Sequence, residues 1–136
     1  MTHLLILFLS FCLLTACTAG LNIRQAEDGC SEGDAQACFD LATAYVVGHK
    51  VKVNSKTAVR YYQYSAGQGH VLAQRNYASA LEFGVGIEKS LYHAYVWYMT
   101  AALKGDPVAG MGVKRIGQQF GPELLTQANA DALQLP

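Results

Sequence analysis

The fold is decided by residues 34–69, DAQACFDLATAYVVGHKVKVNSKTAVRYYQYSAGQG, because residues 70–105, HVLAQRNYASALEFGVGIEKSLYHAYVWYMTAALKG, repeat their pattern. Eight positions keep the same residue at a spacing of 36, and each is alanine, glycine or tyrosine: Ala37/Ala73, Ala42/Ala78, Ala44/Ala80, Gly48/Gly84, Ala58/Ala94, Tyr62/Tyr98, Ala66/Ala102 and Gly69/Gly105. Such a period indicates a duplicated helical unit that buries its apolar face against its neighbours. We therefore expect an all-α fold, an α/α superhelix in which helical hairpins stack as a right-handed solenoid.

Each copy has the pattern of a helix, a glycine-containing turn and a second helix. From residue 35 to residue 47, apolar side chains recur at spacings of three and four, the period of one helical face. Gly48 then stands where the end of a helix favours a left-handed residue, and Asn54 or Ser55 is suited to capping the next helix. Gly84 and Ser90 hold the same places one period later.

The alanines and tyrosines that recur in both copies predict how the helices pack. Alanine at a crossing lets two helix axes approach closely, and an aromatic ring opposite it fills the remaining space. We expect Ala58 and Ala94 at such crossings, with Tyr62 and Tyr98 in the core. A bulky replacement at either alanine is expected to overpack its crossing by about 1–3 kcal/mol.

The pattern weakens on both sides of these two repeats. Residues 106–136 begin in register but diverge, and a turn at 121–122 predicts a last helix over 123–133. The terminal units of a solenoid need a polar outer face. We interpret residues 106–136 as a degenerate C-terminal capping repeat with four polar residues on that face: Gln127, Asn129, Asp131 and Gln134. One period before repeat 1, residues 17–33 are expected to hold a partial first helix.

The apolar run over residues 4–16 is too short to span a bilayer, which takes about 20 residues. It is typical of a signal-peptide core. Its end resembles the lipobox of bacterial lipoproteins in Leu14, Thr15, Ala16 and Cys17. The resemblance implies a signal peptide over residues 1–16 and lipid attachment at Cys17. Thr18, in place of aspartate, implies sorting to the outer membrane, facing the periplasm. Because no lysine or arginine precedes residue 17, an ordinary cleaved signal and an uncleaved anchor remain alternatives.

Charge and cysteine content narrow the possible partners and the compartment. The ten basic and ten acidic residues are balanced and dispersed, which argues against nucleic acid or an anionic lipid surface as the partner. After removal of the signal and lipidation of Cys17, Cys30 and Cys38 remain as a pair. In an oxidising periplasm such a pair is expected to form a disulfide, and two buried free thiols are the alternative.

The repeated motifs resemble a known family. Ala37-x3-Leu41-Ala42 through Gly48, followed by Ala58-x2-Tyr61 and Ser65-Ala66-x2-Gly69, resembles the Sel-one-like repeat (SLR), a tetratricopeptide-type helix pair, and the second copy matches more closely. The resemblance covers about residues 34–120. Departures include Lys50, where the turn usually has glycine. The Cys30-x7-Cys38 spacing is similar to that of cysteine-rich bacterial members, in which it implies a bridge between successive helices.

An enzyme is the main alternative function, since some cysteine-rich relatives are associated with penicillin binding or hydrolysis. Serine acyl transfer of that kind needs Ser-x-x-Lys and a Lys-Thr-Gly strand. No serine in this sequence has lysine three residues later, and Lys56-Thr57 is followed by alanine. The histidines lack the short ligand pairs of zinc sites. We therefore expect no catalytic residue, metal or cofactor.

The resemblance implies a membrane-anchored periplasmic scaffold that binds a protein or peptide, with no small-molecule substrate. A structural lipoprotein without a fixed partner is a further alternative. By analogy with tetratricopeptide domains, a partner-binding groove is expected along the first helix of each unit. In repeat 1 its residues are Gln36, Phe39, Asp40, Thr43 and Val47. In repeat 2 they are Leu72, Arg75, Asn76, Ser79, Glu82 and Phe83.

Overall fold

The computed structural model describes residues 20–136. The predicted signal peptide over residues 1–16 and the predicted lipid site at Cys17 lie outside the described residues. Among the helices that are described, none combines the length and the apolar character needed to cross a membrane.

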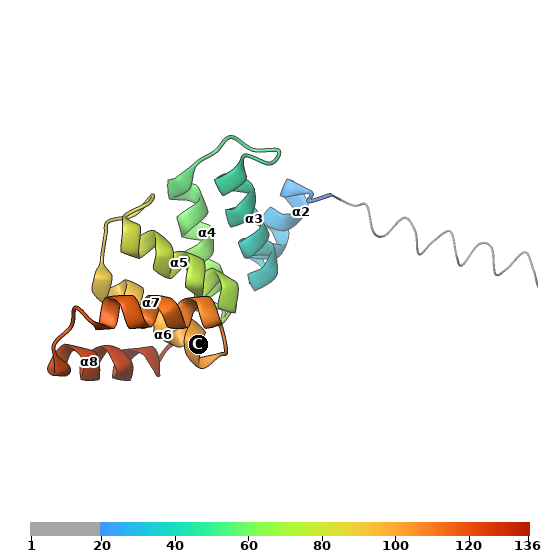
Figure 1. The fold of residues 1–136 in the computed structure, drawn as a ribbon. Coiled ribbons are helices and arrows are strands. Elements are labelled where there is room, and N and C mark those ends of the chain that lie inside the picture. The colour runs from blue at the N-terminus through green and yellow to red at the C-terminus, as the bar shows by residue number, and fades with distance from the viewer. Residues whose placement is uncertain (1–19) are drawn as a thin grey trace, which may run out of the picture.

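Residues 20–136 form seven α-helices and no β-strand: α2 (Ile23–Ser31), α3 (Ala35–Val47), α4 (Ser55–Gly67), α5 (Val71–Phe83), α6 (Leu91–Leu103), α7 (Pro107–Gly117) and α8 (Pro122–Ala132). Helices adjacent in sequence pack against each other from α2 to α7, and the ribbon advances in one direction from α2 to α8 (Figure 1). The expected all-α helical solenoid is confirmed.

The helix boundaries follow capping residues that recur with the 36-residue period. Asp34, His70 and Asp106 cap the N-termini of α3, α5 and α7, and each accepts a hydrogen bond from a backbone N–H of the first turn. Asn54 and Ser90 do the same for α4 and α6. The duplication therefore preserves the start of each helix as well as its packing face.

The predicted close crossings are present in the core. Ala58 and Ala94 are 1% and 0% exposed, and Ala94, Tyr62 and Tyr98 belong to one buried apolar cluster. Cys30 and Cys38 form a disulfide that joins α2 to α3, as expected. Cys38 is fully buried, so the bridge lies inside the α2–α3 contact.

The C-terminal helices depart from the pattern of the repeats. Helix α8 packs mainly on α6, while it has few contacts with α7. Tyr95 Oη donates a hydrogen bond to Asn129 Oδ1 at 2.9 Å, and Tyr92 Oη donates to an Asp131 carboxylate oxygen. Asn129 is exposed and Asp131 is partly exposed, so both lie on the surface as expected, and their side chains also hold α8 against tyrosines of α6.

Candidate functional site

A groove of about 1020 Å³ lies between α2 and α3, at the end of the solenoid where the described chain begins. We call it the α2–α3 groove. All five residues predicted for repeat 1 line it: Gln36, Phe39, Asp40, Thr43 and Val47. The α2 side supplies residues that sequence reasoning missed, among them Ala26, Asp28 and Glu32. A signal for them existed, because the period had already placed a helix before residue 34.

The contacts between successive units explain why this groove is open. The ring of Phe39 in α3 stacks on His70, the N-cap of α5, with 4.6 Å between ring centroids. One period later, Arg75 in α5 forms an ion pair of 3.2 Å with Asp106, the N-cap of α7. Within residues 20–136, no helix makes the equivalent contact with Asp34, the N-cap of α3.

The α2–α3 groove combines carboxylates with apolar side chains. Its carboxylates are Asp28, Glu32, Asp34 and Asp40, and no lysine or arginine is among the described residues that line it. Val47 is 64% exposed at one end, and Phe39 is half-buried along the wall. The surface therefore suits an apolar partner that also carries positive charge.

A hydrogen-bond chain runs from the wall of the groove to the start of α5. Gln36 Nε2 donates to Asp40 Oδ1 at 2.8 Å, and Gln36 Oε1 lies 3.0 Å from His70 Nε2. His70 Nδ1 accepts from the backbone N–H of Ala73 at 3.2 Å, which places the ring proton of neutral His70 on Nε2. Burial lowers the pKa of His70, and the nearby Asp40 carboxylate partly opposes this.

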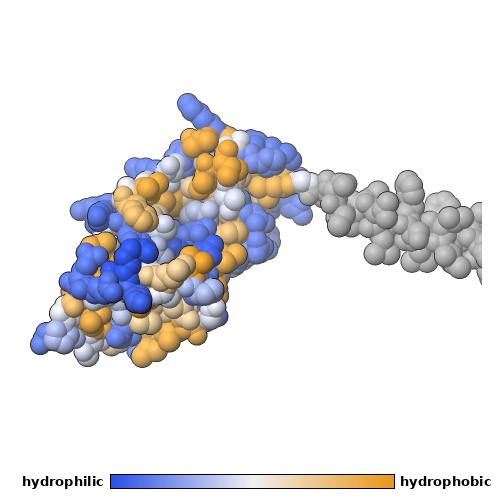
Figure 2. All heavy atoms as spheres, viewed as in Figure 1, coloured by the Kyte–Doolittle hydropathy of each residue, from blue (hydrophilic) through white to orange (hydrophobic). Residues whose placement is uncertain are grey.

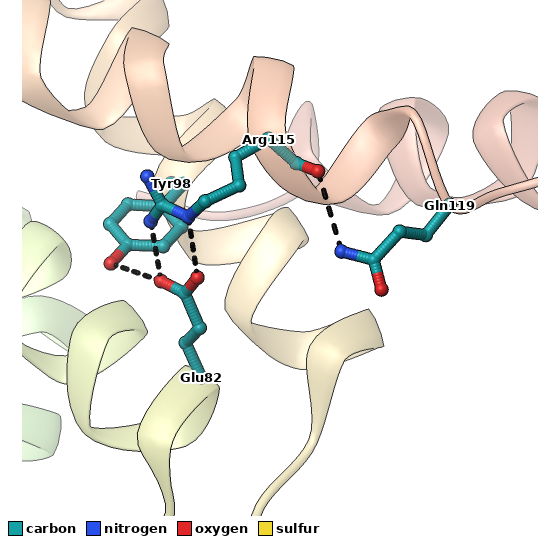
Figure 3. Close-up of polar contacts among 4 residues, drawn as sticks. All are labelled: Glu82, Tyr98, Arg115 and Gln119. Atoms are coloured by element: carbon teal, nitrogen blue, oxygen red, sulfur yellow. Dashed lines mark hydrogen bonds and ion pairs between the residues drawn. The ribbon is translucent and has the colours of Figure 1, made fainter.

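Two of the charged residues predicted for repeat 2 are engaged within the chain. Arg75 is held by Asp106. Glu82 is buried, and both its oxygens accept hydrogen bonds of 2.7 Å from Arg115, while Tyr98 Oη donates at 2.9 Å (Figure 3). The hydrogen bonds from Arg115, and to a lesser degree the one from Tyr98, lower the pKa of Glu82 against the opposing effect of burial.

The remaining residues predicted for repeat 2 do not share one groove with those of repeat 1. Asn76 and Ser79 line a separate pocket of about 340 Å³ between α4 and α5. Leu72 and Phe83 are 42% and 65% exposed. Exposed apolar atoms gather over the turn that joins α3 to α4 and over the end of α5 (Figure 2). The exposed apolar residues of these two segments are Val46, Val47, Val53, Phe83 and Val85.

The pocket of about 340 Å³ occupies the place in the repeat that the Glu82–Arg115 pair occupies one period later. Moving its lining residues forward by 36 converts Val46 into Glu82 and Ser79 into Arg115. We call the contact between α3 and α5 the first junction and the contact between α5 and α7 the second junction. The long charged side chains of Glu82 and Arg115 occupy the second junction, whereas the short side chains of Val46 and Ser79 leave the first junction open. The groove assignment of the repeat 2 residues stays a prediction, but Arg75 and Glu82 already have ionic partners.

The described residues contain no group of histidine, cysteine, aspartate and glutamate side chains that is suited to a metal ion. The α2–α3 groove, at about 1020 Å³, is larger than two pockets of about 630 and 340 Å³ elsewhere on the described chain.

The comparisons with known proteins agree with the repeat structure. The Sel1 repeat family matches residues 35–70 and 71–106. The fold is similar to that of a protective antigen of uropathogenic Escherichia coli strains that displays an SLR fold, with a TM-score of 0.73 and 23% identity over 82% of this chain and 24% of that one. It is also similar to a Sel1 repeat protein from Oxalobacter formigenes, with a TM-score of 0.65 and 28% identity over 67% of this chain and 37% of that one.

No curated protein matches the sequence. The chain spans about a quarter and about a third of the lengths of the two solved structures, so it resembles a segment of each. The family match covers both copies of the 36-residue unit, begins within one residue of the N-caps Asp34 and His70, and takes in more than half of the sequence. With its helices, caps and core placed by that unit, the chain belongs to the Sel1 repeat family.

Proposed function

We propose that the chain is a periplasmic lipoprotein that binds a protein or peptide partner in the α2–α3 groove and has no catalytic activity. Sel1 repeat proteins are generally scaffolds for protein–protein interaction. The observation that carries the proposal is the meeting of all five predicted repeat 1 residues in one groove. Its volume is large enough for several side chains of a partner.

Anchoring is the second part of the proposal. Lipidation of Cys17 would hold the domain at the inner face of the outer membrane, because several acyl chains make anchoring effectively permanent. The test compares the wild-type chain with Cys17→Ser after labelling with a fatty-acid analogue and fractionation of the cell envelope. We expect Cys17→Ser to lose the label and the outer-membrane location. A variant that keeps both would remove the lipoprotein proposal.

The groove is tested with a photo-crosslinking amino acid at Val47, which is 64% exposed in the groove. The matched control places the same amino acid at Leu133, which is 69% exposed after α8. Crosslinks are identified by mass spectrometry in intact cells. We expect a defined partner at Val47 that is absent at Leu133 and lost when Asp40→Lys is added. Equal crosslinking at both sites would contradict the groove assignment.

A further inference from the structure

The α2–α3 groove lies where the first helix of a unit before repeat 1 would pack. Residues 20–136 contain only the second helix of that unit, α2. In the next unit, α3 itself fills the equivalent place: Phe39 contacts Tyr62 and His70, and Thr43 Oγ1 lies 3.3 Å from Tyr62 Oη. Moving Tyr62 and His70 back by 36 gives Ala26 and Asp34, and both line the groove. The residues that receive a helix are therefore present on α2 and α3.

The α2–α3 groove is also wider than the equivalent surface of α4 and α5, on which α3 packs. Ala26 stands where Tyr62 fills the space beneath α3. Asp34 uses Oδ1 to cap α3, accepting from the N–H groups of Gln36 at 2.8 Å and Ala37 at 3.1 Å. No donor within residues 20–136 bonds to its other oxygen, Oδ2. That oxygen is available to a donor from outside the described chain.

The third unit indicates which donor would suit this place. Asp106, two periods after Asp34, uses Oδ1 to cap α7 and Oδ2 to hold Arg75 at 3.2 Å. Arg75 comes from the first helix of the preceding unit. Asp106 thus shows how an aspartate that caps a first helix, α7, can also bind a cation from the first helix of the preceding unit, α5. Asp28, Glu32 and Asp40 add negative charge around Asp34.

We infer that the α2–α3 groove binds an amphipathic helix of a protein partner, which completes the solenoid and carries a cation near its N-terminal third. The cation pairs with Asp34 as Arg75 pairs with Asp106. Apolar side chains of the helix lie on Ala26, Phe39 and Val47. The inference rests on the proposed partner-binding function and adds the kind of partner and its orientation.

The test uses the full chain in detergent micelles and a synthetic peptide as the probe. The peptide has the sequence of residues 70–83, which includes Arg75, with blocked ends and a side-chain staple that holds it helical. Binding is followed by fluorescence anisotropy. Asp34→Asn removes the charge of the cap and keeps an oxygen that accepts from the α3 backbone. Glu123→Gln, an exposed acid at the start of α8, is the matched control.

We expect saturable binding that Asp34→Asn weakens about fivefold and that Glu123→Gln leaves unchanged. A peptide in which Arg75 is replaced by glutamine should lose the same factor. Combining that peptide with Asp34→Asn should cost no more than either change alone, because the two groups form one interaction. Circular dichroism of each protein variant checks that the helices are retained.

Three outcomes would overturn the inference: no saturable binding, equal effects of Asp34→Asn and Glu123→Gln, or additive effects of the protein and peptide changes. Two other occupants would also be detected. Binding that appears only after removal of residues 1–19 would assign the groove to that segment. Self-association of the chain that Asp34→Asn abolishes would assign it to a second copy. Persistence of the Val47 crosslinks without peptide binding would leave the proposed function in place and remove only the helical partner.

Discussion

At the N-cap of α5, His70 replaces the aspartate that stands at both equivalent positions, Asp34 and Asp106. An imidazole caps a helix only while Nδ1 is unprotonated, since the protonated ring has no acceptor. The bond from His70 Nε2 to Gln36 fixes the same tautomer. The start of α5 is therefore the one first-helix cap, among the three described, whose strength depends on pH near neutrality.

This cap predicts a loss of stability in mild acid. The unfolded chain protonates His70 near its ordinary pKa of 6.5, whereas burial lowers the pKa in the folded protein. The contribution of the neutral ring is complete above about pH 6.5 and is lost as the pH falls through the lower, folded-state pKa. We expect Tm to fall over this range in the wild type and to fall less in His70→Asn, which keeps a capping oxygen.

Thermal unfolding followed by circular dichroism between pH 7.5 and pH 5 measures this effect, within the range where histidines titrate. His49→Asn is the control, because His49 is exposed and its side chain forms no hydrogen bond within residues 20–136. The control should keep the pH dependence of the wild type. Identical slopes for the wild type and His70→Asn would assign the acid sensitivity to another group.

The Glu82–Arg115 pair gives a second prediction at the residue scale. Arg115→Ser leaves a buried carboxylate with only the hydroxyl of Tyr98, and we expect it to cost about 2 kcal/mol of unfolding free energy. Adding Glu82→Val removes the unpaired charge and restores the residue types of the first junction, Val46 and Ser79. The double variant should therefore be more stable than Arg115→Ser alone.

Urea denaturation of the two variants, with the wild type beside them, measures the difference. Removing Arg115 leaves the buried Glu82 carboxylate without its cation, whereas replacing both side chains leaves no unpaired charge and is far less costly. A double variant that is less stable than Arg115→Ser would show that the two side chains contribute mainly by filling space. In that case we would expect the double variant to have a pocket at the second junction like the one of about 340 Å³ at the first junction.

At the scale of elements, α7 contains a pair of glycines that test its packing on α6. A Cβ at Gly112 would lie 2.7 Å from the ring of Tyr98, whereas a Cβ at Gly110 would have nothing within 4 Å. We expect Gly112→Ala to destabilise the protein by about 1–3 kcal/mol through overpacking. Gly110→Ala should be neutral or stabilise it by up to about 1 kcal/mol, because alanine favours a helix. Chemical denaturation of both variants gives the comparison, and equal effects would contradict the close α6–α7 approach.

The sequence was sufficient for the elements that the repeat dictates. Spacing alone placed Gly48 at the left-handed end of α3 and Ser90 at the start of α6, and the structure has both. The same spacing contained the first-helix caps at Asp34, His70 and Asp106, which our sequence reasoning did not use. Local chemistry that recurs at a fixed period can be predicted because each unit repeats the same constraints.

Contacts that break the period could not be predicted in this way. Nothing in the sequence shows that α8 packs on α6, so the bonds of Asn129 and Asp131 to tyrosines were missed. The Glu82–Arg115 pair was missed for a related reason, since the equivalent positions in the preceding unit are valine and serine. The groove of repeat 1 was anticipated as a set of residues, but its α2 wall depends on tertiary packing.

For the whole molecule, stability is expected to vary along the solenoid. Each unit contacts mainly its neighbours, so a local change should act locally. The Cys30–Cys38 disulfide holds the short helix α2, and its loss should cost about 2.5 kcal/mol on the chain-entropy model. We expect the variant with both cysteines changed to alanine to lose amide protection in α2 while α5 and α6 keep theirs.

Hydrogen exchange measured by mass spectrometry tests this gradient. The oxidised wild type is the reference, and the reduced wild type should match the alanine variant. Equal loss of protection in α2, α5 and α6 would show that the described chain unfolds as one cooperative body and that the nearest-neighbour description fails. If the loss of amide protection is confined to α2, we also expect the α2–α3 groove to bind its partner more weakly under reducing conditions.

The disulfide also determines how the domain would respond to tension from its N-terminal side. A force applied at residue 20 would first break the hydrogen bond from Lys50 Nζ to the carbonyl of Leu21 and then peel residues of α2 from α3. The covalent link at Cys30 would stop this peeling and transmit the load to Cys38 inside α3. The slack released before that point is about 35 Å of extended chain. A load from that side would therefore enter the domain at α3, however much of α2 before Cys30 had separated.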